Sequence, residues 1–552
     1  MNKLIKRCMV VALNSFAFMS LTHALTPYPV TVMGKQNYIF IDNQLDHEYF
    51  LSSIALDPRF TGANVWARIG KTNQSSLGYM GNNEYMPANS YVDYWLENSP
   101  IKNPFQGSRC WAISAACPSV GYIQPELMDD QGSYKSKITI GEDGGAYLRG
   151  SFAPGAYDYF EKQTIGNTDT IQMNVCYTKQ EYNPKKGERC KNLPDAAGSL
   201  WRVMQLDATK IGHLIIEDTH AYSEIWVATD GAPSLAEDTE YCRYEVITAA
   251  GLPDQNEGIV CKMAKYNLKG DLSQFSTALR FYMVLNTDVL GFTPATRDMQ
   301  IQAGKNVWMP YDYQGNVLKD MFVQGSGYVE VMFSKAFFKK FLTSGGATKG
   351  RDDVFTFMLN NVVAPQSGFY QFRTSVNVDI IPREYSISIK PKDVNKTSAE
   401  GSIGTDQPID FEYKVTQSAP QKADIVTAQV LGDSTVKNGQ KYCLFKSDDD
   451  VTQVAIPAFL SFTEEQGTKQ QEYSGCDDSK KMDMTKAQWN VVPWDEQQSG
   501  FFYSTDLKLS FPMNDSISKL SLDGSDWIGT VHAEGDVKVE AKWIGVDAGN
   551  RH

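Results

Sequence analysis

The sequence holds little histidine and lacks the residue spacings that mark common catalytic and metal sites. Six histidines occur in 552 residues, and they are scattered. His47-Glu48 begins like a zinc-protease motif, but no second histidine follows four residues later. No paired C-x-x-C knuckle and no G-x-S-x-G nucleophile turn is present. These absences argue against a metal centre or a Ser-His-Asp hydrolase, and we expect no catalytic residue, metal or cofactor.

Excess positive charge is also absent. The chain has 52 Lys and Arg against 65 Asp and Glu, a net charge of −13. An acidic surface repels phosphate backbones, so we expect no nucleic acid partner. The segment 345–352 has two glycines at the spacing of a phosphate-binding loop, but Arg351 and Asp352 replace the required Lys and hydroxyl residue. Acidic runs at 448–450 and 477–478 lack the glycine and glutamate of a calcium loop and indicate solvated loops.

Long apolar segments are missing after the N-terminus. Residues 1–7 carry three cations, residues 8–21 are apolar except for Asn14, Ser15 and Ser20, and Thr22-His23-Ala24 offers small residues to a signal peptidase. This pattern predicts a secretory signal peptide over 1–24, with Leu25 as the first mature residue. Its apolar stretch is too short for a comfortable membrane span.

Nine cysteines occur, and the first, Cys8, lies in the predicted signal peptide. The other eight form four pairs of sequence neighbours, and we expect each pair to be a local disulfide, although other connectivities stay open. Disulfides persist in oxidising compartments, which agrees with secretion. The expected pairs are Cys110 with Cys117, Cys176 with Cys190, Cys242 with Cys261, and Cys443 with Cys476.

Apolar and polar residues alternate along much of the chain, as in 385–389, 411–415 and 537–543. A period of two indicates strands with one buried face, and turn clusters separate them. Ser334 is expected to cap a short helix that carries Phe337, Phe338, Phe341 and Leu342. The fold class predicted is all-β, with tandem immunoglobulin-like antiparallel β-sandwiches and a few short helices.

More than 500 mature residues exceed one hydrophobic core, so roughly two to four domains are expected. Polar breaks near 218 and 385 divide the chain into a signal peptide (1–24), an N-terminal β domain (25–218), a middle β-sandwich (219–385) and a C-terminal β-sandwich (386–547). The break near 218 is the weaker of the two. The alternative to a domain boundary there is that the N-terminal and middle segments share one core.

Aromatic residues gather between positions 79 and 111, interleaved with asparagines. Aromatic rings stack on sugar rings and amides bond hydroxyl groups, so this composition suits a glycan-binding patch, with Tyr85, Trp95 and Trp111 as its candidate members. The alternative is that these rings fill the core. Tyr94 and Trp95 are adjacent on a predicted strand and point to opposite faces, so at most one of them would be exposed.

The last predicted strand has one apolar face, formed by Val537, Val539, Ala541 and Trp543. Little sequence remains to cover the outer edge of this strand. An open apolar edge invites pairing with another chain, so these four residues are expected to border a groove for a donated strand.

Several blocks of the sequence resemble the tip adhesins of the common pilus (the Ecp, or Mat, fimbriae), which belong to the alternative chaperone–usher pathway. They include 56–64, 76–79, 95–100, 230–235, 447–449, 475–479 and 511–514, and they follow one another in the same order. The eight mature cysteines also fall where that family has them. The resemblance covers nearly all of the mature chain.

The resemblance implies a protein exported through the periplasm to the fimbrial tip at the cell surface. It would attach bacteria to host cells and to one another in biofilms, and it would help to assemble the major pilin. The implied partners are the major pilin subunit, a periplasmic chaperone, an outer-membrane usher and a host-cell receptor, for which a glycan is one candidate. Pilin domains of such systems are completed by a donated strand, and polymerisation with itself stays open.

Two other functions compete with this one. A secreted carbohydrate-active enzyme built on β-sandwiches would need two positioned carboxylates, and a chain with 65 acidic residues offers many. A purely structural subunit would initiate the fibre and bind no receptor.

Overall fold

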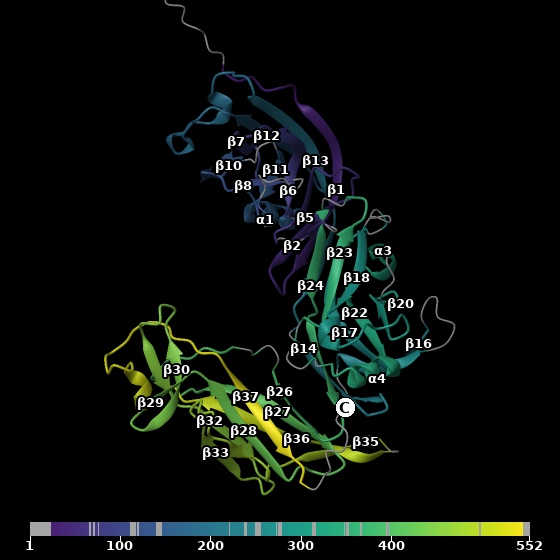
Figure 1. The fold of residues 1–552 in the computed structure, drawn as a ribbon, viewed down its shortest axis with the longest axis vertical. Helices are drawn as coiled ribbons and strands as arrows, with labels where there is room; N and C mark the ends of the chain where they lie inside the picture. Colours follow the sequence, from purple (N-terminus) through teal and green to yellow (C-terminus); the bar gives the residue numbers. More distant parts are fainter. Residues whose placement is uncertain are drawn as a thin grey trace, which may run out of the picture. The chain divides into compact units, whose positions relative to one another are not determined.

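The structure is a computed structural model. It describes residues 24–544 except for 66–67, 70–71, 76, 111–117, 119–120, 140–145, 220, 237–239, 249–255, 272, 274–278, 312–315, 347, 349–350, 352, 365–366, 394–395, 397 and 496–497. The predicted signal peptide therefore lies outside the described residues except for Ala24. Strands dominate, with short helices between them (Figure 1), so the chain is all-β, as predicted.

The chain divides into two compact units. The first unit comprises Met1–Tyr38, Phe50–Lys210 and Ala364–Gly368, and the second comprises Ile39–Tyr49, Ile211–Val363 and Phe369–His552. Two long strands, β1 (Thr31–Asn43) and β13 (Leu200–Glu217), contribute residues to both units.

The first unit is a β-sandwich of two runs of paired strands. One run holds β3 (Phe60–Ala63), β6 (Tyr79–Met86), β11 (Ala146–Phe152) and β8 (Phe105–Cys110). The other holds β9 (Leu127–Met128), β10 (Gly132–Lys137), β7 (Tyr91–Glu97), β12 (Thr168–Thr178) and β13. The unit also contains β2 (Glu48–Ser53), β4 (Arg68–Ile69), β5 (Thr72–Ser75) and α1 (Pro154–Lys162).

The two runs pack face to face through aromatic and methionine side chains. The ring centroids of Tyr94 and Phe105, one from each run, lie 6.0 Å apart. The backbone N–H of Asn82 donates a hydrogen bond to the sulfur of Met204 at 3.2 Å. Gly81 permits this approach: its φ is +111°, and a Cβ there would lie 2.9 Å from the sulfur of Met173. A larger residue at 81 would therefore force the two layers apart.

The outer face of β7 and β12 is covered by the loop that connects β12 to β13. This loop contains the 3₁₀ turns η1 (Pro184–Lys186) and η2 (Cys190–Asn192), and the Cys176–Cys190 disulfide ties it to β12. Leu25 packs beneath it, and its backbone N–H donates to the carbonyl of Leu193 at 3.0 Å. The mature N-terminus predicted at Leu25 is thus part of the first unit's core.

The second unit begins with a mixed β arrangement. Its strands are β17 (Asn256–Gly270), β22 (Gly325–Ser334), β16 (Cys242–Ile247), β19 (Met299–Gln302), β20 (Met309–Pro310), β14 (Ala221–Val227), β15 (Pro233–Ser234), β25 (Val376–Pro382), β18 (Leu279–Leu285), β21 (Asn316–Val317), β23 (Phe355–Asn361) and β24 (Phe369–Arg373). The short helices are α2 (Thr287–Leu290), α3 (Leu318–Met321) and α4 (Lys335–Thr343). Unlike the antiparallel pairing predicted throughout, β14 and β25 pair in parallel.

Helix α4 confirms a local prediction from the sequence. The Ser334 hydroxyl accepts a hydrogen bond from the backbone N–H of Phe337 at 3.2 Å, which caps the helix. Phe337, Phe338 and Phe341 are buried on one side, and the helix ends before Gly345. In the same part of the chain, Cys242 and Cys261 are opposite each other on β16 and β17 and form a disulfide.

The C-terminal part of the second unit, residues 386–542, contains three groups of paired strands. The largest holds β26 (Ser386–Pro391), β27 (Ile409–Ala419), β36 (Gln498–Phe511), β32 (Phe459–Thr463), β33 (Lys469–Tyr473) and β35 (Asn490–Asp495). The others are β34 (Met482–Asp483) with β28 (Ile425–Gly432) and β37 (Gly535–Lys542), and β29 (Ser434–Lys437) with β30 (Gln440–Lys446) and β31 (Gln453–Ile456). The 3₁₀ turn η5 (Ser516–Lys519) packs near β31, and Cys443–Cys476 forms a disulfide.

Three of the four predicted cysteine pairs are thus disulfides in the structure. Cys117 lies outside the described residues, so the Cys110–Cys117 bond stays a prediction.

Candidate functional site

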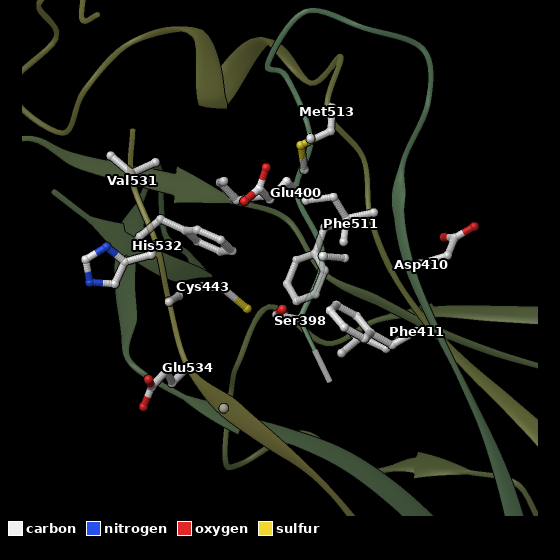
Figure 2. A pocket seen from close by; sticks show the side chains of 18 of the residues that line it. Ser398, Glu400, Asp410, Phe411, Cys443, Phe511, Met513, Val531, His532 and Glu534 are labelled. Carbon is white, nitrogen blue, oxygen red and sulfur yellow. The ribbon is translucent and has the colours of Figure 1, made fainter. Parts of the chain in front are cut away.

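The sandwich of residues 386–542 is open at one side. A cavity of about 1830 Å³ lies there, between strand ends and two loops. Figure 2 shows the rings of Phe411 and Phe511 turned toward Cys443 across this groove, whereas Asp410 and His532 point away from it. The floor is mostly apolar and includes Val430, Phe445, Ile456, Leu509 and Met513.

The groove exists because two walls lack a neighbouring strand. Strand β26 pairs with β27 only from Tyr413 onward, so residues 409–411 have β36 on one side and the groove on the other. Among the described strands, β37 pairs with β28 alone, and its first residues line the groove. Strand edges of this kind present backbone donors and acceptors to an incoming strand.

Ionic pairs fix the polar rim of the groove. Asp410 contacts Lys508, Asp433 pairs with Lys446 at 2.7 Å, and Lys392 of the rim pairs with Asp506 at 2.8 Å. Burial raises the pKa of Asp410, but the Lys508 ammonium and the Ser510 hydroxyl outweigh it, and the net pKa is lowered. An occupant therefore meets an apolar floor below a charged, solvated rim.

The four residues predicted to border the groove divide between two environments. Val537 lines the groove. Val539 is 8% exposed and belongs to the sandwich core, and Ala541 packs against that core. Trp543 meets the ring of Tyr385 at 5.7 Å, and its Nε1–H donates to the carbonyl of Gln421 at 2.9 Å. The prediction is therefore wrong for Val539, Ala541 and Trp543, because β26 and β37 close the sandwich at that end.

Sequence reasoning missed most of the groove. Phe411, Phe445 and Phe511 come from three strands far apart in the chain, Met513 follows the last of these strands, and no short motif joins them. The alternation of 411–415 showed that Phe411 lies on an apolar face. It carried no sign that this face is left uncovered at one end.

The candidate residues of the predicted aromatic patch do not share one surface. Tyr85 is 46% exposed and meets Tyr147, its partner on β11, with ring centroids 5.3 Å apart. Trp95 is only 4% exposed, so its assignment to an exposed surface is wrong. Both faces of β7 are covered, one by the opposing strands and one by the loop held by Cys176–Cys190. Trp111 lies outside the described residues.

The described residues hold no group of three or more His, Cys, Asp or Glu side chains arranged to bind a metal ion. In the same part of the chain, no helix is both long and apolar enough to cross a membrane.

A solved structure described as a chaperone–tip adhesin complex of CFA/I fimbriae biogenesis matches 58% of this chain and 96% of its own, at 9% identity. The TM-score of 0.19 is too low to carry a structural argument.

Sequence comparison is far more specific. Residues 25–214 match the E. coli common pilus adhesin EcpD N-terminal domain, residues 218–377 the EcpD middle domain, and residues 384–541 the EcpD C-terminal domain. The curated "Fimbria adhesin EcpD" proteins of Escherichia coli O157:H7 and of strain K12 are each 33% identical over 530 residues, which cover 93% of this chain and 94% of theirs. The chain therefore belongs to the EcpD family of fimbrial adhesins.

Proposed function

We propose that this adhesin sits at the tip of a fimbrium, attaches bacteria to host cells and to one another, and joins the major pilin by accepting an extended segment of that subunit. The groove in residues 386–542 is the observation that carries this proposal. A periplasmic chaperone would occupy the groove first, and an outer-membrane usher would exchange it for the pilin. The protein would act by binding, without catalysing a reaction.

The energetics favour a strand as the occupant. Each large apolar side chain newly buried in the groove contributes roughly 1.5–3 kcal/mol, so four or five contribute on the order of 10 kcal/mol before ordering costs. The free edges of β27 and β37 supply backbone hydrogen bonds in addition. A compact small molecule would use neither the length of the groove nor these strand edges.

The test adds a peptide with the sequence of the major pilin's N-terminal segment to the purified full chain. We expect tight binding and a higher melting temperature. Val537→Lys places a charge in the groove and should abolish both effects. Val436→Lys is the matched control, because Val436 is 62% exposed on β29 and does not line the groove. A parent chain whose melting is unchanged by the peptide would refute strand acceptance.

We assign receptor binding to the N-terminal domain, 25–218, followed by a middle domain, 219–385, and a C-terminal pilin-like domain, 386–547. The ranges matched by the three EcpD domain models support this division. The exposed pair Tyr85 and Tyr147 supplies a stacking surface in the N-terminal domain.

Bacteria carrying Tyr85→Ala and Tyr147→Ala should assemble normal fimbriae and adhere less. Tyr244→Ala, which removes an exposed ring at 57% exposure in the middle domain, should adhere like the parent. Fimbriated parent bacteria that adhere to no host cell would favour a purely structural subunit. Release of sugar products from a bound glycan would favour the enzyme.

A further inference from the structure

Four side chains meet on the outer face of the first unit, beside the loop between β12 and β13. Asn174 of β12 is directly opposite Trp95 of β7, and Cys176 of β12 is opposite Trp201 of β13. Residues opposite each other in an antiparallel pair share a face, so both indoles and the Asn174 amide lie on one side of the sheet. The two indole rings are 5.8 Å apart. Lys191, which lies in the loop between β12 and β13, is the fourth member of this group.

The loop holds Lys191 in place. Lys191 lies in η2, directly after Cys190, which is bonded to Cys176. The backbone N–H of Cys190 also donates to the buried carboxylate of Asp93 at 2.9 Å. The Lys191 ammonium consequently lies 5.2 Å from the ring centroid of Trp95 and 5.9 Å from that of Trp201.

The group has more hydrogen-bond donors than acceptors. The Trp201 Nε1–H donates to Asn174 Oδ1 at 2.9 Å, which fixes the amide and leaves its Nδ2 as a second donor. Asn174 is fully buried and Trp95 is 4% exposed, and in the described part of the chain neither Asn174 Nδ2 nor Trp95 Nε1 has a hydrogen-bond partner. Burying a hydrogen-bond donor without an acceptor is unfavourable, because the donor loses its hydrogen bond to water.

The lysine adds a positive charge to these two donors. No carboxylate among the described residues lies within 4.0 Å of the Lys191 ammonium. Lys191 is only partly buried, and its flexible side chain lies over both rings. Rotation of this side chain, which is fast at a surface, would uncover the parts of the two rings that the ammonium lies over.

We propose that this group, Trp95, Asn174, Lys191 and Trp201, is a binding site for an acidic saccharide. The ammonium calls for acceptor oxygens with negative charge, as a sugar carboxylate or sulfate supplies, and the two buried donors of the same group have no acceptor of their own. The indole of Trp201, which is partly exposed, offers an apolar face to the sugar ring. A neutral sugar would gain the stacking contact and leave the lysine without its counter-ion. The inference rests on the proposed attachment function and names the class of receptor.

The test measures binding of sialyllactose, sulfated lactose and lactose to the immobilised full chain. We expect an acidic probe to bind and lactose to bind much more weakly, and the two acidic probes distinguish carboxylate from sulfate. Lys191→Gln should weaken acidic binding by roughly 10- to 100-fold, the size of a hydrogen bond to a charged group. Lys191→Arg should retain most of it.

Lys186→Gln is the matched control, because it removes the same charge from an exposed position in the same loop. Equal losses in Lys186→Gln and Lys191→Gln would reduce the effect to general electrostatics and overturn the site. A parent chain that binds lactose as well as the acidic probes, or that binds none of them, would also overturn it. Host-cell adhesion of the parent is measured in parallel: if it persists, only this site fails, and if it is absent, the proposed attachment function fails.

Discussion

The first unit and the C-terminal part of the second unit use similar strands but fill their interiors differently. In the first unit, both faces of β7 are covered by other parts of the chain, including a loop fastened by Cys176–Cys190 and by Leu25. In residues 386–542, apolar side chains such as Phe411 and Phe511 face a cavity of about 1830 Å³. The first sandwich is covered by its own chain, whereas the second leaves a large cavity beside its apolar side chains.

Under the proposed function, this difference separates two tasks, receptor binding by the first unit and joining of the fibre by residues 386–542. A receptor-binding region must keep its shape in the open, and a fastened, fully packed sandwich does so. A region that joins a fibre needs a large reserve of apolar area for its neighbour, and an incomplete sandwich holds that reserve. Three predictions test the contrast.

The largest effect is expected in the incomplete sandwich. Residues 386–547 produced alone should be unstable or aggregated, and fusing the major pilin's N-terminal segment after a flexible linker should yield a soluble monomer. The gain would be on the order of 10 kcal/mol, comparable with the ~5–15 kcal/mol stability of a whole domain. Thermal melts with and without the fused segment measure it.

The same fusion with its apolar residues replaced by serine is the control. A lone region that is already monomeric, melts cooperatively and is unchanged by the fusion would show that its sandwich is complete, and the contrast would collapse.

The sequence predicted the all-β class, the capped helix at Ser334 and three cysteine pairs, because each depends on neighbours in the chain. The parallel pairing of β14 with β25 joins strands about 150 residues apart, and no local pattern encodes it.

The sites were harder to predict, for the same reason. The alternation of apolar and polar residues predicted which side of β37 is apolar. Whether that side is covered depends on where the pairing of β26 with β27 ends. Trp95 was predicted at the surface from the aromatic and asparagine composition of 79–111, but residues distant in the sequence, Leu25, Tyr182 and Cys190, pack against it.

The second prediction contrasts a buried with an exposed ring in the first unit. Trp95→Ala should lower the free energy of unfolding by about 3–5 kcal/mol, since it empties a packed position. Tyr85→Ala should change it by less than about 0.5 kcal/mol. Denaturant unfolding of the full chain, followed by tryptophan fluorescence and circular dichroism, measures both. Similar small effects would place Trp95 at the surface after all.

The smallest expected effect is a dependence of the first unit's stability on pH. Asp93 is fully buried on the covered face of β7, where its carboxylate accepts from the Tyr182 hydroxyl and from the backbone N–H groups of Cys190 and Lys135. Burial raises the pKa of Asp93 to about 6, against the lowering effects of these donors and of Arg189.

Because the pKa of Asp93 is higher in the folded than in the unfolded chain, the folded state binds the proton more tightly. Protonation therefore stabilises the fold, and this contribution is lost as pH rises through about 6. We expect the unfolding free energy of the parent to fall by on the order of 2–3 kcal/mol between about pH 4 and pH 7 from this group. Asp93→Asn, which stays neutral, should remove that slope, and the difference between parent and variant cancels the titration of other carboxylates. Parallel stability–pH curves for the two proteins would show that Asp93 has an ordinary pKa.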